Sequence, residues 1–109
     1  MSAPSIAATP WTWPAEVLDF ADRQSVRPYL DPLREAIQRV FPTAREVKIL
    51  LEEDAEIRDD WYIVFEIYVP DVDVPNYYAA KQPWYREFFR LCPKSRLGAF
   101  RHSLFLVSN

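Results

Sequence analysis

The sequence is poor in three residue types on which many active sites depend. Among its 109 residues it has one glycine (Gly98), one histidine (His102) and one cysteine (Cys92). One glycine excludes the P-loop, the dinucleotide-binding G-x-G-x-x-G turn and the G-x-S-x-G nucleophile elbow, because each needs several glycines. One histidine and one cysteine exclude zinc fingers and zinc ribbons, because structural zinc takes four nitrogen or sulfur ligands. No cofactor-binding motif is found, and we expect no cofactor.

Two further absences bear on where the protein works. A single cysteine cannot form an intrachain disulfide, which favours a reducing, cytoplasmic setting. No apolar run approaches the roughly 20 residues of a membrane span. Residues 1–14 also lack the basic and apolar regions of a secretory signal. We therefore expect a soluble protein of the cytoplasm.

Apolar side chains, in contrast, are plentiful: 50% of the residues are hydrophobic and 16% are aromatic. This length and composition predict one globular domain. We place that domain at residues 14–109, after a tail of Pro, Ala and Trp residues over residues 1–13. The tail contains Trp11 and Trp13. Because an exposed indole is costly, these side chains either fold back on the core or anchor a partner.

Apolar residues at helical spacing predict three helices. The first runs from Pro14 to about residue 24, since proline suits the first turn of a helix. In the second, Asp31 is the expected N-cap and Pro32 the first helical residue. Its apolar face is formed by Leu33, Ala36, Ile37, Val40 and Phe41. The third helical region covers residues 76–92, in which Pro83 restarts or kinks the helix.

Alternating apolar residues predict three strands, at residues 46–53, 61–69 and 100–107. The link between the first two strands, residues 54–60, is short and polar, which indicates an antiparallel hairpin. The expected order is α-α-β-β-α-β. The fold class is therefore α+β, a two-layer domain whose three-stranded sheet is at least partly antiparallel and has helices on one face.

The second strand carries an unusual outer face, formed by Tyr62, Val64, Glu66 and Tyr68. This face is too apolar for a fully solvated sheet surface. Two interpretations remain open. Either the N-terminal tail or flanking aromatic residues cover it, or it binds a partner.

Charge is segregated along the chain, although the net charge is only −3. Residues 46–73 carry ten acidic against two basic side chains, and residues 74–109 carry one against six. The acidic cluster lies around the hairpin tip and consists of Glu52, Glu53, Asp54, Glu56, Asp59 and Asp60. It is a solvated loop, a surface that mates with a basic site on another protein, or a site for a hard metal ion. The D-x-D-x-D-G pattern of a calcium loop is absent, which disfavours the metal.

The basic C-terminal third suggests a different ligand. Its basic residues alternate with aromatic ones, an arrangement that can bind single-stranded nucleic acid. The residues concerned are Arg86, Arg90, Lys94, Arg96 and Arg101. The negative net charge opposes this interpretation, because phosphate contacts need a positive potential.

Few residues are candidates for catalysis. His102 could act as a general base, but Ser103 beside it points to the opposite face of the strand. Cys92 lies on an apolar helix face, as a buried hydrophobic residue does. Glu66 stands in an otherwise apolar strand, where burial would raise its pKa. Glu66 and His102 are therefore the residues on which an enzymatic function, with or without a divalent metal, would depend.

Two stretches carry a resemblance to known proteins. Val-Phe-Pro-Thr-Ala-Arg-Glu-Val, residues 40–47, leads into the first strand, and Glu-Asp-Ala-Glu-Ile-Arg-Asp-Asp, residues 53–60, precedes the second. Together they resemble small uncharacterised bacterial proteins, some of them accessory or antitoxin-like. The resemblance covers residues 33–69 and identifies no site residue. A superficial likeness to the start of a minimal nucleotidyltransferase lacks the Gly-Ser and spaced-aspartate signature of that family.

These observations lead us to expect a small, non-catalytic protein that binds another protein, as an accessory subunit or an antitoxin- or immunity-like inhibitor. The acidic hairpin would steer the encounter and aromatic side chains would anchor it. The expected anchors are Trp11, Trp13, Tyr62, Tyr68, Tyr77 and Tyr78. We expect a partner encoded by a neighbouring gene, or a second copy of the chain.

Overall fold

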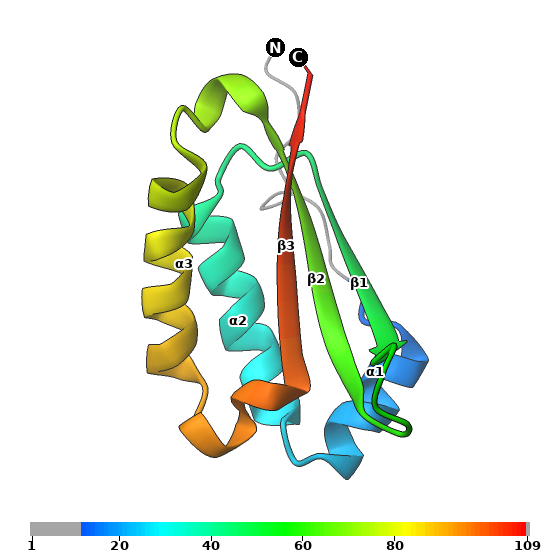
Figure 1. Cartoon of the computed structure of the whole chain (residues 1–109). Coiled ribbons are helices and arrows are strands. Elements are labelled where there is room, and N and C mark those ends of the chain that lie inside the picture. The colour runs from blue at the N-terminus through cyan, green and yellow to red at the C-terminus, as the bar shows by residue number, and fades with distance from the viewer. Residues whose placement is uncertain (1–11, 109) are drawn as a thin grey trace.

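A three-stranded sheet forms the frame of the molecule, and two long helices lie against one of its faces (Figure 1). The computed structural model describes residues 12–108. The elements are α1 (Ala15–Arg23), α2 (Arg27–Val40), β1 (Glu46–Glu53), β2 (Trp61–Pro70), the short 3-10 helix η2 (Asp71–Asp73), α3 (Tyr77–Leu91), the 3-10 helix η3 (Lys94–Ala99) and β3 (Phe100–Val107). The predicted order α-α-β-β-α-β and the α+β class are confirmed.

The sheet is mixed, with β2 between β1 and β3. β1 and β2 form the predicted antiparallel hairpin, in which Glu46 is opposite Tyr68. β3 pairs with β2 in parallel, with Phe100 beside Ile63. Parallel neighbours need a long connection, which α3 provides by crossing one face of the sheet. One face of the sheet therefore packs against the helices, and the other face points away from them.

The core lies between the sheet and the helices. Ile63, Phe65 and Ile67 of β2 are almost fully buried there, as the period-two pattern predicts. The helices bring to this layer Val17, Phe20 and Ala21 of α1, Leu30, Leu33, Ala36 and Ile37 of α2, and Trp84 and Phe88 of α3. α1 itself lies beside the end of β1 that leads into the hairpin turn (Figure 1).

The predicted start of the second helix is wrong. α2 begins at Arg27, with Pro28 in its first turn, and contains Pro32. Pro28 suits the first turn, because a helix leaves its first N–H groups unbonded in any case, whereas Pro32 lies inside the helix and cannot donate to the Pro28 carbonyl. The earlier start is favoured because it adds Leu30, which is only 2% exposed, to the buried face that begins at Leu33 in the prediction.

The third helix is continuous and does not restart at Pro83. The Asn76 side chain caps α3 by accepting a hydrogen bond from the Ala79 N–H at 3.0 Å. Pro83 lies inside the helix, where it cannot donate to the Ala79 carbonyl. The buried residue Trp84 follows it directly and keeps the helix on the sheet. Within residues 12–108, no helix has the length and apolar content needed to cross a membrane.

Candidate protein-binding surface

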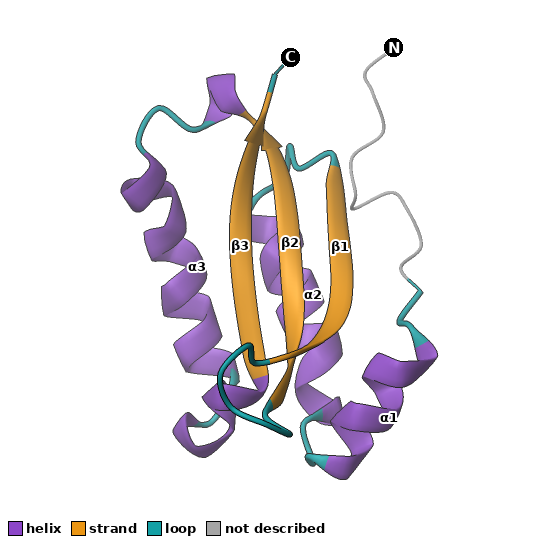
Figure 2. Ribbon diagram, turned by 45° about the vertical axis from the view of Figure 1, so that its right-hand side comes forward, coloured by secondary structure: helices purple, strands orange, loops and turns teal. Residues whose placement is uncertain are grey.

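The outer face of the sheet has no helix over it in the part of the chain that the structure describes (Figure 2). We call it the open face. The strand register places on it Lys48 and Leu50 of β1, Tyr62, Val64, Glu66 and Tyr68 of β2, and Arg101, Ser103, Phe105 and Val107 of β3. Its central strand thus carries the predicted residues, but Val64 is only 5% exposed, so neighbouring side chains cover the centre of the face.

Aromatic rings on the open face are held by contacts between neighbouring strands. Tyr68 stacks on Phe105 with 5.0 Å between ring centroids, and the Lys48 ammonium lies 5.3 Å from the Tyr68 ring. The Arg101 guanidinium lies 4.8 Å from the Tyr62 ring. Phe105 remains 40% exposed. Rigid rings with a polar rim are typical of interface hot spots.

The acidic loop, residues 52–60, consists of the last two residues of β1 and the turn that leads to β2, and it lies on the side of the open face (Figure 2). Arg58 is its one basic residue. The loop is ordered by its own carboxylates: Asp54 Oδ1 accepts hydrogen bonds from the N–H groups of Glu56 (2.8 Å) and Ile57 (3.0 Å). These two bonds hold the pKa of Asp54 below its ordinary value. Its negative charges are therefore presented on a defined turn.

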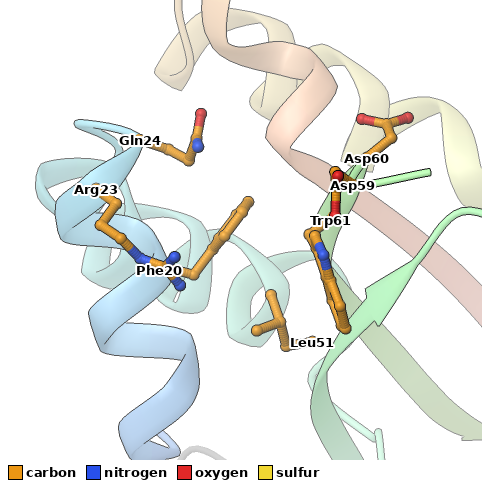
Figure 3. A pocket seen from close by; sticks show the side chains of 7 residues that line it. All are labelled: Phe20, Arg23, Gln24, Leu51, Asp59, Asp60 and Trp61. Carbon is orange, nitrogen blue, oxygen red and sulfur yellow. The ribbon is translucent and has the colours of Figure 1, made fainter. Parts of the chain in front are cut away.

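A hollow of about 570 Å³ opens between the acidic loop and the end of α1 (Figure 3). We call it the hairpin groove. It is lined by Phe20, Arg23, Gln24, Leu51, Asp59, Asp60 and Trp61. A second hollow, of about 240 Å³, shares Phe20, Gln24, Asp60 and Trp61 and extends the groove toward Arg96 of η3.

Sequence reasoning missed this groove. The period-two pattern placed Trp61 on the core face of its strand, whereas the structure leaves it 42% exposed at the first position of β2. The signal that could have found it is the pair of acidic residues directly before the tryptophan.

Trp13 is the tryptophan of the N-terminal segment that the structure describes. Trp13 is half-buried against the core, with its ring 6.3 Å from that of Phe65, and its indole N–H donates to Asp31 Oδ1 at 3.2 Å. It therefore folds back on the domain, which was one of the two expectations. Trp11 lies outside the described residues.

The residues considered for catalysis do not come together. Glu66 lies on the open face and accepts a hydrogen bond from the Tyr68 hydroxyl at 3.3 Å. His102 faces the helices, with Trp84 and Tyr85 against its ring. Burial, and then the nearby Lys81 ammonium, lower the pKa of His102 to about 4, so the ring is neutral at pH 7.

The structure also bears on Cys92 and on the hypothesis of a metal site. Cys92 is 2% exposed, and burial raises the pKa of its thiol, so little thiolate forms at neutral pH. Among residues 12–108, no three His, Cys, Asp or Glu side chains gather as a metal site requires. The acidic loop therefore presents its carboxylates outward and does not converge them on one point.

The basic residues of the C-terminal third occupy different surfaces. Arg86 and Arg90 line a hollow of about 480 Å³ between α2 and α3, where Glu87 bonds Arg90 at 2.7 Å. Lys94 and Arg96 lie on η3, and Arg101 lies on the open face. They do not form the continuous basic track that a nucleic-acid strand follows.

Comparison of the chain with protein-family models, with curated proteins and with solved structures gives no significant match.

Proposed function

We propose that this chain is a small, non-catalytic binding protein that docks on a basic surface of another protein through its open face and acidic loop. The observation that carries the proposal is the set of rings on the open face. Tyr62 lies next to a loop of six acidic residues and one basic residue, and Tyr68 and Phe105 stack toward the other end of the face. An accessory or inhibitory role in the cytoplasm fits this chemistry.

Charge complementarity defines the partner. The acidic loop creates a negative potential at one end of the open face, and such a potential steers the approach of a positively charged surface. The rings would then be desolvated against apolar or aromatic side chains of that partner. We therefore expect a partner whose contact surface combines basic residues with an apolar centre.

The test compares capture by three forms of the protein. The wild type is compared with the open-face double variant Tyr68→Ser/Phe105→Ser and with Tyr78→Ser, which removes a tyrosine that is 79% exposed on α3. A protein that is retained by the wild type and by Tyr78→Ser, but lost from the double variant, is the partner. Measured with that purified protein, the double variant should bind at least tenfold more weakly, and Tyr78→Ser within about twofold of the wild type.

The electrostatic part is tested on the association rate. Glu52→Gln/Glu56→Gln should slow association and make it less sensitive to salt, because these carboxylates steer the encounter. Asp71→Asn, outside the acidic loop, should leave the rate unchanged. If no protein distinguishes the wild type from the open-face variant, or if association does not depend on salt, the proposed function is wrong.

A further inference from the structure

Two aromatic side chains lie on opposite walls of the hairpin groove. Phe20 of α1 and Trp61 of β2 face each other across the hollow, with Leu51 below them (Figure 3). Phe20 is 5% exposed and belongs to the core, whereas Trp61 is 42% exposed and is the wall that a ligand would reach. A flat, half-exposed indole beside an apolar floor can cover a planar group from one side.

The charge of the groove itself is negative, because two carboxylates, Asp59 and Asp60, line it against the one guanidinium of Arg23, and Arg96 lines only its extension. Asp59 and Asp60 lie on the Trp61 side of the hollow, and neither carboxylate is bonded by another described residue. Arg23 lies on the opposite wall, but its guanidinium is paired with Asp19 of its own helix at 3.5 Å. The uncharged Gln24 amide lies beside Arg23 (Figure 3). A cation that enters from outside therefore meets unpaired carboxylates on one wall.

The backbone of one groove residue is held in an uncommon conformation. Asp59 (φ 63°) lines the groove, and the other described non-glycine residue with positive φ, Ser25 (φ 58°), follows the lining residue Gln24 in sequence. Left-handed backbone is unfavourable for L-residues, and it concentrates at binding sites. The Asp59 N–H donates to Glu53 Oε2 at 3.0 Å, which fixes the turn. The Asp59 backbone is thus positioned by the fold.

We infer that the hairpin groove is the pocket for an arginine side chain of the partner protein. This inference rests on the proposed function and specifies the contact that the acidic loop makes. A planar guanidinium can stack on the Trp61 indole and bond to Asp59 or Asp60, while its methylene stem lies on Leu51. Lysine fits less well, because its compact ammonium neither stacks nor binds a carboxylate with two parallel bonds.

The test uses two synthetic peptides and the whole chain. Acetyl-Ala-Arg-Ala-amide and its citrulline counterpart have the same shape, and only the first is charged. Titrated into the ¹⁵N-labelled protein, the arginine peptide should shift the Trp61 indole N–H signal in a saturable way, with a dissociation constant in the millimolar range. The citrulline peptide should bind at least tenfold more weakly, because it retains the shape but lacks the cation.

Matched variants assign the effect to the groove. Asp59→Asn/Asp60→Asn removes both charges and keeps the turn, since asparagine also tolerates positive φ. It should weaken binding of the arginine peptide at least tenfold. Asp71→Asn/Asp73→Asn, at the opposite end of β2, removes the same charge and should leave binding unchanged. Trp61→Leu should also weaken binding several-fold, which separates stacking from charge.

Three outcomes would overturn the inference: no saturable shift, equal binding of the two peptides, or shifts confined to the open face. None of them would refute the proposed function, which depends on Tyr68 and Phe105 and is tested with the partner protein. Conversely, if no protein binds the open face specifically, the proposed function is wrong, and the peptide titration still shows whether the groove binds arginine.

Discussion

The side chains of Glu66 and His102 lie on opposite faces of the sheet. Phe65 pairs with His102 across the β2–β3 ladder and Glu66 pairs with Ser103, so Glu66 faces outward and His102 faces the helices. A carboxylate and an imidazole that act as acid and base must reach the same reacting group. Since the sheet separates them, an enzyme built on this pair has no shared pocket. This geometry favours the binding proposal over the catalytic alternative.

The depressed pKa of His102 makes the stability depend on pH. The folded state releases this proton at about pH 4, and the unfolded chain at its ordinary value of 6.5. Its contribution is therefore complete above pH 6.5 and is lost as the pH falls toward 4. We expect a loss of about 2 kcal/mol, below the full conversion of the shift because the ring is only partly buried.

Urea unfolding at pH 7 and pH 4.5 measures this loss. In His102→Leu the difference between the two pH values should shrink, because the variant has no imidazole to protonate. An NMR titration of His102 should give a pKa near 4, and Lys81→Gln should raise it, since the Lys81 ammonium disfavours the charged ring. An ordinary histidine pKa in the folded protein would contradict the prediction.

The Tyr68–Phe105 stack should couple the central strand β2 to the edge strand β3 on the open face. With ring centroids 5.0 Å apart, a double-mutant cycle of Tyr68→Leu and Phe105→Leu should give a coupling free energy of about 0.5–1 kcal/mol. Tyr85 and Phe89 on α3 stack at 6.0 Å and provide the comparison within one helix. Additive effects of the Tyr68 and Phe105 substitutions would show that the contact contributes nothing.

Trp13 should contribute to stability, because it packs on Phe65 and bonds to Asp31. Trp13→Ala should lower the free energy of unfolding by about 2 kcal/mol, less than a fully buried tryptophan would. Trp13→Phe should recover most of the packing and lose the hydrogen bond. Tyr78→Ala, at a more exposed ring, should change stability by no more than about 0.5 kcal/mol. Equal effects at Trp13 and Tyr78 would show that Trp13 does not pack as described.

Gly98 offers a stabilising substitution. Its φ is not in the left-handed region, and a Cβ added there meets no atom within 4 Å. Gly98→Ala should raise the free energy of unfolding by about 0.4–1 kcal/mol, because alanine restricts the unfolded chain. Asp59→Ala should do the opposite, since Asp59 has positive φ and alanine is poorly suited to it. Thermal unfolding of the two variants in parallel distinguishes these outcomes.

The fold was predictable where a period was unambiguous. Ile63, Phe65 and Ile67 alternate with polar or outward residues, and the structure buries them as expected. The start of α2 was not predictable in the same way. Asp31-Pro32 has the local chemistry of a helix start, yet burial of Leu30 favours an earlier one. Local signals rank alternatives, and packing between distant segments decides among them.

One part of the candidate site could be predicted from the sequence, and another part could not. Tyr62 and Tyr68 share a face because strand residues alternate, which sequence alone reveals. The hairpin groove depends on how close the end of α1 lies to the start of β2, so Phe20 and Trp61 meet only in the folded chain. No spacing in the sequence predicts this contact between α1 and β2. The alternation of the strand therefore predicted Trp61 to be an ordinary core residue.

The order in which the strands join the sheet sets the expected course of folding. β1 and β2 are neighbours in sequence, and hairpins of this kind close in microseconds. β2 gains its second neighbour only after the chain has passed through η2, α3 and η3, a closure with a larger entropy cost. Until then the apolar edge of β2 and the inner side of α3 stay accessible to other molecules. During synthesis, this protein should therefore depend on chaperones most in the interval before residues 100–107 emerge.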